Sequence, residues 1–591
     1  MGGAFVDRFL LKVCLCFGCI ALLPLTGCNA IKQVEQVFGN RPSQNMPAYK
    51  PVQVHYEDQN WTSQQRTWFY HAAQGAELLP YKWFLALEQP KLTLFHPAPR
   101  FADPDYLAGF GFLPDPASPQ NPDGLPVGFA KDDVRDPQTG TPLQVVGLTC
   151  SACHTGQLEY QGKGVRIDGG TASAELAAFQ TELGFAAAFT DKLPFRFDRF
   201  AKNVLGDNAS SEDKKNLRDQ LRAFLKVGLA EAQAAEDGNL YAAVGGFGRT
   251  DALGRIGNYV FGTELSPKNL VVANAPVKFP PLWDTSWFSW VQYDYSIQQP
   301  MVRNIGEALG VRARVNLTDP AKLYSNTVNV KNLWLTEQQL AGPTAFHGLA
   351  PPKWPADIFG PLDPVKVQQG ATLYQQHCQR CHLPPLDSPA LQDNQFWEQG
   401  LAGRRFLKLK TLPLQVIGTD PNEAEDWSKR QADTGVLGKG TVPATVGLQL
   451  VTTEIRDRAY DAMNLSPEQR MEWNGYRGDG VTAPLVYRAR PLAGIWATPP
   501  FLHNGSVPNL YELLLPATQR SKEFYTGSRS FDPVRVGYQR EAFPGAFGFH
   551  TDAVGNSNAG HEFNNTPGKG VIGPELTDAE RWALIEYLKS L

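Results

Sequence analysis

Apolar residues are spread unevenly along the chain, and their first run lies close to the N-terminus. Val13–Leu25 follows the basic residues Arg8 and Lys12, and it is too short for a membrane-spanning helix. The run ends in Leu-Thr-Gly directly before Cys28, which is typical of a bacterial lipoprotein signal. We therefore predict a signal peptide over residues 1–27 and a lipid on Cys28; a plain signal peptide cleaved elsewhere is the alternative.

Two amphipathic segments in the last part of the chain predict helices. Val367–Cys378 places Gly370 and Tyr374 on one helical face, and a glycine there permits another backbone to approach closely. The second segment begins with a capping box and continues as an apolar stripe at helical spacing. Its box and stripe comprise Thr577, Glu580, Leu584, Ile585 and Leu588.

A proline-rich segment divides the chain. Residues 341–363 concentrate prolines, which interrupt regular structure and mark a linker. A length of 591 residues also calls for more than one domain. We therefore predict a polar tether over 28–60, an N-terminal domain over 61–340, the linker, and a C-terminal domain over 364–591.

Composition and charge narrow the class of protein. Hydrophobic residues make up 42% of the chain and charged residues 19%, which is typical of a folded globular protein. The formal net charge of −4 disfavours nucleic acid as a partner.

Two pentapeptides carry the chemistry: Cys150-Ser151-Ala152-Cys153-His154 and Cys378-Gln379-Arg380-Cys381-His382. In C-x-x-C-H, the two thiols add to the vinyl groups of a porphyrin, and the adjacent histidine ligates its iron. A zinc site would need two further ligands, and a thioredoxin-like pair would need neither the histidine nor a second copy. We therefore predict two covalently bound haem c groups, with His154 and His382 as their proximal ligands.

The cysteine count agrees with this interpretation. The chain has 8 cysteines, of which Cys14, Cys16 and Cys19 fall in the signal and Cys28 takes the lipid. The remaining four are those of the two pentapeptides. They carry haem thioethers or, as the alternative, form two short C-x-x-C disulfides.

The sixth ligand of each iron decides between electron transfer and reaction with a small oxidant. The C-terminal domain is rich in candidates for the His382 iron. We favour His561, which lies in a glycine- and asparagine-rich loop before the last helix, and rank His503 next. The full set is His503, His550, His561, Met463 and Met471.

The region after His154 offers almost no ligand. No histidine occurs between His154 and His347, and the one methionine in that interval is Met301. The upstream histidines, His55, His71 and His96, lie in tether-like or loop-like sequence. We therefore expect the His154 iron to be five-coordinate or weakly ligated, and to be the reactive centre.

An aromatic cluster lies between the two pentapeptides. Aromatic rings pack well against porphyrin, and tryptophan or tyrosine can carry an oxidising equivalent between redox centres; an ordinary aromatic core patch is the alternative. The cluster comprises Phe279, Trp283, Trp287, Phe288, Trp290, Tyr293 and Tyr295.

The order of several segments now supports a family resemblance. An early C-x-x-C-H is followed by residues 275–285 (APVKFPPLWDT), 303–310 (RNIGEALG), a second C-x-x-C-H, and 487–505 (YRARPLAGIWATPPFLHNG). This order resembles the di-haem cytochrome c peroxidase superfamily, and most closely its branch with the di-haem rubber oxygenase.

The resemblance implies a mainly α fold with two cytochrome c-like haem domains, long irregular loops and little β structure. It implies that the His154 haem binds the oxidant, that the His382 haem is six-coordinate through His561, and that Trp283 lies near the active haem. A calcium ion, present in some members, is a further possible cofactor. No residue here matches the distal acid–base group of the peroxidases, so peroxidase and oxygenase activities stay open.

Together these observations predict an exported di-haem c-type oxidoreductase. Its expected partners are a small oxidant (peroxide or dioxygen) and an electron-donor protein or organic substrate. It would contact a membrane only through its lipid anchor, in the bacterial cell envelope, at the outer membrane facing the periplasm or the cell surface. The alternative is an electron carrier with both irons six-coordinate; a haem sensor would need an attached signalling segment.

Overall fold

The computed structural model describes residues 46–93 and 96–591. The predicted signal peptide and the lipid-carrying Cys28 lie outside these residues. The described chain is a mixed α and β structure, 39% helical and 16% strand, with many small sheets. The expectation of a mainly α fold with little β structure was therefore wrong. Most of the strands are only two to four residues long, too short to produce an alternating pattern in the sequence.

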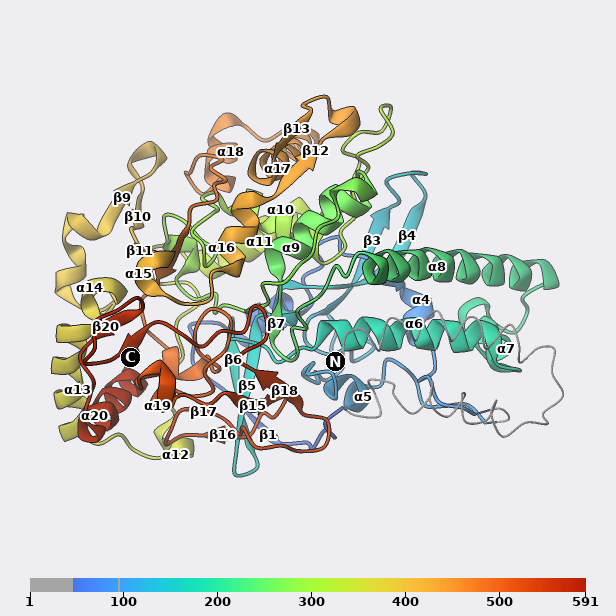
Figure 1. Cartoon of the computed structure of the whole chain (residues 1–591). Helices are drawn as coiled ribbons and strands as arrows, with labels where there is room; N and C mark the ends of the chain where they lie inside the picture. The colour runs from blue at the N-terminus through green and yellow to red at the C-terminus, as the bar shows by residue number, and fades with distance from the viewer. Residues whose placement is uncertain (1–45, 94–95) are drawn as a thin grey trace.

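Helices occur along the whole described chain (Figure 1). They are α3 Ser63–His71, α4 Tyr81–Ala86, α5 Pro104–Ala108, α6 Leu176–Lys192, α7 Arg196–Leu205, α8 Ser211–Asp237, α9 Ala252–Gly257, α10 Pro300–Gly310, α11 Val330–Ala341, α12 Ala356–Phe359, α13 Pro364–His377, α14 Gln379–His382, α15 Leu414–Ile417, α16 Asn422–Lys429, α17 Ala444–Ala462, α18 Pro467–Trp473, α19 Leu510–Leu513 and α20 Asp578–Ser590.

The strands pair in small sheets. They are β1 Gln53–Tyr56, β2 Leu79–Pro80, β3 Phe129–Arg135, β4 Pro142–Leu148, β5 Thr155–Tyr160, β6 Lys163–Asp168, β7 Arg249–Thr250, β8 Val277–Lys278, β9 Trp397–Gln399, β10 Arg405–Leu407, β11 Lys410–Pro413, β12 Gln431–Asp433, β13 Thr441–Pro443, β14 Val486–Ala489, β15 Glu523–Thr526, β16 Phe531–Asp532, β17 Gly537–Tyr538, β18 Phe547–His550, β19 Glu562–Phe563 and β20 Val571–Gly573.

Two three-stranded sheets hold the first C-x-x-C-H segment. One has the order β2-β4-β3 and the other β1-β6-β5. A short 3-10 turn, Cys150–Ala152, connects β4 of the first sheet to β5 of the second. The first haem-attachment segment is thus a tight connection between two sheets.

The second C-x-x-C-H segment lies beside a helix pair. α13 ends at its first cysteine, and α13 packs against α20 at the same edge of the molecule (Figure 1). A Cβ on Gly370 would lie 2.1 Å from the carbonyl oxygen of Ala583, so the glycine permits the crossing. The capping box of Thr577 and Glu580 is present. Both helices predicted from the sequence are confirmed.

One apolar core adjoins both attachment segments. A cluster that includes Trp283 and Trp496 packs against Cys150 and also against Cys378. Its members come from both sides of the proline-rich segment 341–363. The domain limits given above remain a prediction, and the two attachment segments share one core.

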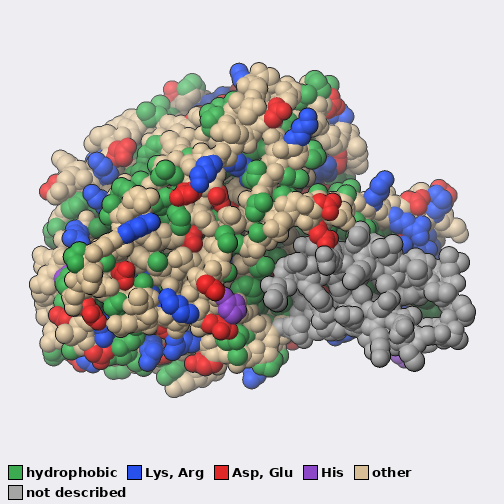
Figure 2. Space-filling view, in the orientation of Figure 1, with side chains coloured by type: hydrophobic (Ala, Val, Ile, Leu, Met, Phe, Trp, Pro, Cys, Tyr) green, Lys and Arg blue, Asp and Glu red, His purple; other side chains and the backbone are tan. Residues whose placement is uncertain are grey.

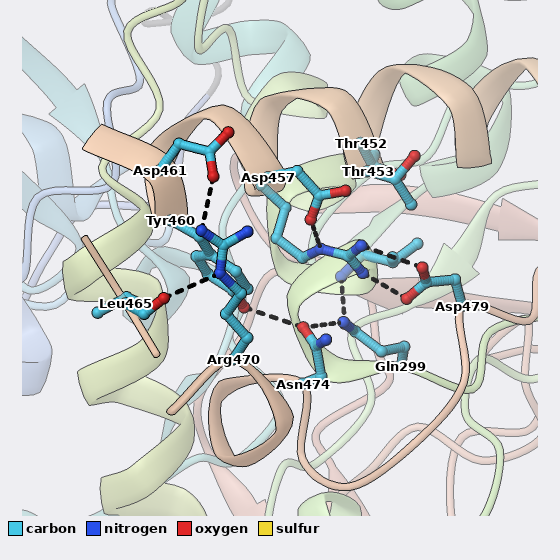
Figure 3. A network of polar contacts seen from close by, with 12 residues as sticks. Gln299, Thr452, Thr453, Asp457, Tyr460, Asp461, Leu465, Arg470, Asn474 and Asp479 are labelled. Carbon is cyan, nitrogen blue, oxygen red and sulfur yellow. Dashed lines mark hydrogen bonds and ion pairs between the residues drawn. The ribbon is translucent and has the colours of Figure 1, made fainter. Parts of the chain in front are cut away.

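A polar network fixes the start of α10, a helix that lines the first site. Gln299 caps α10 and donates from Nε2 to Oδ1 of Asn474 at 2.7 Å. The hydroxyl of Tyr460 on α17 donates to the same oxygen at 3.0 Å (Figure 3). Close by, Arg470 donates to Asp461 at 2.6 Å. These bonds tie α10 to α17 and α18.

The surface has no strongly one-signed region on the face drawn in Figure 2. Basic and acidic side chains are interspersed there among polar and apolar ones. Among the described residues, no helix combines the length and apolar character needed to cross a bilayer.

Candidate haem sites

The first proximal histidine is oriented by a backbone carbonyl. Nδ1 of His154 lies 2.8 Å from the carbonyl oxygen of Pro280. Nδ1 must therefore carry the proton, which leaves Nε2 as the unprotonated nitrogen that can ligate a metal. Burial lowers the pKa of His154 to about 4, so the imidazole is neutral at physiological pH. The ring is in the form that an iron requires.

The second proximal histidine is held in the same way. Nδ1 of His382 lies 2.8 Å from the carbonyl oxygen of Arg490, and burial lowers the pKa of this ring as well. The thiols beside both histidines are unpaired: Cys150, Cys153, Cys378 and Cys381. No disulfide takes them up, so all four are free to form thioethers.

His561 lies opposite His382. Their ring centroids are 6.0 Å apart. Two imidazoles on one metal have centroids about 6 Å apart, because each metal–nitrogen bond is about 2.1 Å and the ring centre lies about 1 Å further. Nδ1 of His561 is buried without a hydrogen-bond partner in the described part of the chain, and burial lowers its pKa to about 3. The pair fits a six-coordinate haem.

A buried arginine fixes the loop that carries His561. Arg520 donates to three carbonyl groups of that loop, those of Asn558, Gly560 and His561, at 2.6, 2.9 and 2.8 Å. The backbone N–H of His561 donates to Ile417 at 3.1 Å. The loop is therefore a preorganised support, although its glycines and asparagines suggest a flexible one.

The other histidines serve elsewhere. His503, the second candidate ligand, stacks on Tyr487 with ring centroids 4.1 Å apart and lies 6.0 Å from the ring of Tyr293. His71 has both ring nitrogens engaged, by Phe129 and Asp115. His550 is exposed at the end of β18.

Charged residues of α10 influence the first site electrostatically. Burial raises the pKa of Cys150 to about 12, with Glu307 and Arg303 as the next largest influences. Glu307 is half-buried and accepts a hydrogen bond from Nε2 of Gln292 at 3.2 Å. Arg303 pairs with Glu337 of α11. In the described part of the chain, the one ring contact of His154 is with Phe279.

Met301, the methionine in this interval, faces the other way. It belongs to the large apolar cluster around α10 and α17. Two residues along a helix correspond to a rotation of about 200°, so Met301 and Arg303 lie on opposite faces of α10. Neither this methionine nor the charged pair was predictable as a site feature from spacing alone.

The two sites share a structural repeat that the sequence did not suggest. Residues 278–300 (the first repeat) and 488–510 (the second repeat) follow the same path at a constant spacing along the chain. The third residue of each supplies the carbonyl that holds a proximal histidine. Further matching features are the left-handed residues Asp284 and Gly494 (φ 65° and 67°), Gln292 and Leu502 (φ 63° and 62°), and the bridges Val291–Ile297 and Phe501–Val507.

The repeats bind each other reciprocally. Lys278 donates its backbone N–H to the carbonyl of His503 at 2.9 Å, and the matching Arg488 donates to the carbonyl of Tyr293 at 3.0 Å. Trp283, which is 0% exposed, donates from Nε1 to the carbonyl of Ala493 at 2.9 Å. Trp283 therefore lies at the contact between the two repeats.

Calcium binding stays a prediction. Within residues 46–93 and 96–591, no group of three or more histidine, cysteine, aspartate or glutamate side chains is arranged to hold a metal ion.

Comparisons with known proteins extend this geometry. Residues 486–525, which include the second repeat, match the family described as RoxA-like, cytochrome c-like. The chain is 47% identical over 575 residues to "Uncharacterized protein y4iJ" of Sinorhizobium fredii (strain NBRC 101917 / NGR234), covering 93% of this chain and 95% of that protein. It is 28% identical over 334 residues to "Uncharacterized protein y4iM" of the same strain, covering 53% and 63%. These matches support a rubber oxygenase-like cytochrome, whereas they do not support placement in the di-haem peroxidase superfamily.

Proposed function

Since this chain belongs to the protein family of y4iJ and carries a RoxA-like, cytochrome c-like segment, we propose that it is a di-haem c-type oxidoreductase with two unequal centres. The His154 centre reacts with peroxide or dioxygen, and the His382 centre stores and relays electrons. The observation that carries this proposal is the difference between the two sites. His561 lies 6.0 Å from His382 at the second site, whereas the first site has the charged residues of α10.

Each residue set has a defined task. The four thiols hold the two haems, and the two proximal histidines ligate them. When bound, haem c supplies a one-electron redox centre and, where an axial position is open, a coordination site for a small oxidant. His561 would ligate a haem held by His382 as well, which would restrict this centre to electron transfer.

Glu307 is the group that holds a proton at the first site. A carboxyl near the reacting centre can give a proton to, or take one from, a small oxidant. Gln292 donates a hydrogen bond to Glu307 and so fixes its orientation. Arg303, neutralised by Glu337, keeps the local charge balanced next to this carboxyl.

Trp283 is the proposed bridge between the centres. It is buried, it belongs to the core that adjoins both Cys150 and Cys378, and it donates its indole N–H across the contact between the repeats. A buried indole between two redox centres shortens the path that an electron travels through the protein.

Export and lipid anchoring complete the proposal. The signal features before Cys28 support export to the bacterial cell envelope, where the protein would be attached to the membrane by its lipid and would use an electron donor or an organic substrate. An electron carrier with both irons six-coordinate is the second candidate, favoured only by the preorganised site around His561.

Turnover of the haem-loaded protein tests the proposal. With hydrogen peroxide and a reduced donor, oxidation of the donor identifies a peroxidase. With dioxygen and an apolar polyene, oxygen consumption with cleavage of the polyene identifies an oxygenase. Absence of both activities in a protein whose two haems are attached supports the electron carrier and contradicts the enzyme.

A further inference from the structure

Two carboxyl groups are buried together beside the contact between the repeats. Asp294 of the first repeat is 0% exposed and Glu423 of α16 is 5% exposed. Among the described residues, three of their oxygens lack a hydrogen-bond partner of good geometry: both carboxylate oxygens of Asp294, and Oε2 of Glu423. Buried carboxylates without partners are costly, so these oxygens require a proton or another ligand.

In the second repeat, the side chain at the position that matches Asp294 has its hydrogen bonds satisfied. Asn504 corresponds to Asp294, and its amide donates to the carbonyls of Gly555 and Ser557 at 3.2 and 2.9 Å. An amide there completes its hydrogen bonds within the fold. The carboxyl in the first repeat does not, although Ser296 and nearby N–H groups partly offset the effect of its burial.

Few charges face the pair. Within the described chain, Arg488 is the one cation that acts on both carboxyl groups. Asp251, the N-cap of α9, and Asp420, in the loop before α16, add negative charge near Glu423. Asp251 is itself stabilised by the N–H groups of Gly254 and Ala275, and it faces Arg430 and Arg255. Asp420 is stabilised by the N–H groups of Asn422 and Ser557, and it faces Arg249. The facing phenols are those of Tyr293 and Tyr487, which are also buried and unpartnered among the described residues.

One cation cannot neutralise two buried carboxylates. Burial raises the pKa of Asp294 to about 7. Burial, and next the charge of Asp294, raises the pKa of Glu423 well above its usual range. Around neutral pH, the pair with Arg488 is therefore electrically neutral when it retains one proton.

The pair is linked to the second centre through a short backbone path. Arg488 lies two residues before Arg490, whose carbonyl holds His382, and its own N–H donates to Tyr293, the neighbour of Asp294. In a buried site of low polarity, one added electron nearby shifts a proton equilibrium strongly.

We propose that Asp294 and Glu423 form a proton-storage site coupled to the redox state of the His382 centre. An external one-electron donor reduces a ferric centre to ferrous, and the carboxylate of the pair takes up one proton from bulk water to become a carboxylic acid. Oxidation returns that proton to water. This inference rests on the proposed function for the presence of the centres.

Redox-difference infrared spectroscopy of the haem-loaded protein tests it, with dithionite as the reductant. We expect reduction to produce a carbonyl band of a protonated carboxylic acid that shifts in D₂O. Asp294→Asn and Glu423→Gln, each close in shape to the natural residue, should both abolish this band. Asp219→Asn, which removes an exposed carboxyl of α8, should leave it unchanged.

The outcomes separate the two proposals. A band that persists in both variants, while their haem spectra and thermal unfolding match those of the unmodified protein, overturns the proton-storage site alone. A band that disappears from the unmodified protein on addition of calcium makes the pair a cation site and overturns it as well. A chain that attaches no haem contradicts the proposed function together with this inference.

Discussion

The two haem sites are held alike on one side and differ on the other. On the proximal side, the third residue of each repeat presents a carbonyl 2.8 Å from Nδ1 of a histidine. Beyond the proximal side, the second site has His561 on a loop fixed by Arg520, 6.0 Å from His382, whereas at the first site the charges of Arg303 and Glu307 on α10 act on Cys150. A duplicated scaffold therefore preserves the attachment of the cofactor, while the elements outside the repeat determine its chemistry.

Removing the two thiols of one haem site at a time should have the largest effect on turnover. The double substitution Cys150→Ala and Cys153→Ala should lower turnover by a factor on the order of 10³ or more, because it removes the reactive centre. The matched double substitution Cys378→Ala and Cys381→Ala should instead remove the relay. Pyridine haemochrome content and turnover check both variants, and full turnover in the first variant would contradict the assignment of roles.

His561→Ala should make the two sites more alike. The second centre would lose its sixth ligand, so about half of the total haem signal should change from low-spin to high-spin and begin to bind carbon monoxide. Electronic and magnetic spectra measure this change. His550→Ala is the control, since His550 is exposed on β18; a low-spin signal that survives in His561→Ala would show that another residue ligates the iron.

Glu307→Gln tests the polar side of the first site. Loss of a proton-transferring carboxyl should reduce kcat about 100-fold or more without changing the spin state of either haem. Glu231→Gln, on α8 and paired with Arg312, provides a control carboxyl away from the site. Unchanged kcat in Glu307→Gln would mean that protons reach the first site by another route.

The matching residues His503 and Tyr293 permit a finer comparison. Burial lowers the pKa of His503 from 6.5 to about 3, so the unfolded chain binds more protons than the folded one between these values. This residue's contribution to stability is therefore complete above pH 6.5 and is lost as the pH falls toward 3. Between pH 7 and 4.5, the free energy of unfolding of the unmodified protein should fall by about 2 to 3 kcal/mol more than that of His503→Phe.

Denaturant unfolding at the two pH values measures that difference. Tyr293→Phe is the matched control, because a phenol does not titrate in this range. An equal pH dependence in all three proteins would show that His503 is not held neutral by the fold.

The sequence predicted the parts of the site that depend on covalent chemistry. C-x-x-C-H is local, so Cys150 to His154 and Cys378 to His382 were recognisable from spacing, as were the helices around Gly370 and Thr577. The strands were not, since pairs such as Val277–Lys278 are too short for a periodic pattern. The repeat was not recognised either, because its matching residues share backbone conformation rather than side-chain type: Asp284 with Gly494, and Tyr293 with His503.

The central claim is that the two centres are unequal, and the magnetic spectrum of the oxidised, haem-loaded protein tests it most directly. Electron paramagnetic resonance at low temperature should show one low-spin centre with two imidazole ligands, from His382 and His561, and one high-spin, five-coordinate centre at His154. Two low-spin, six-coordinate centres would contradict the claim and make the protein an electron carrier.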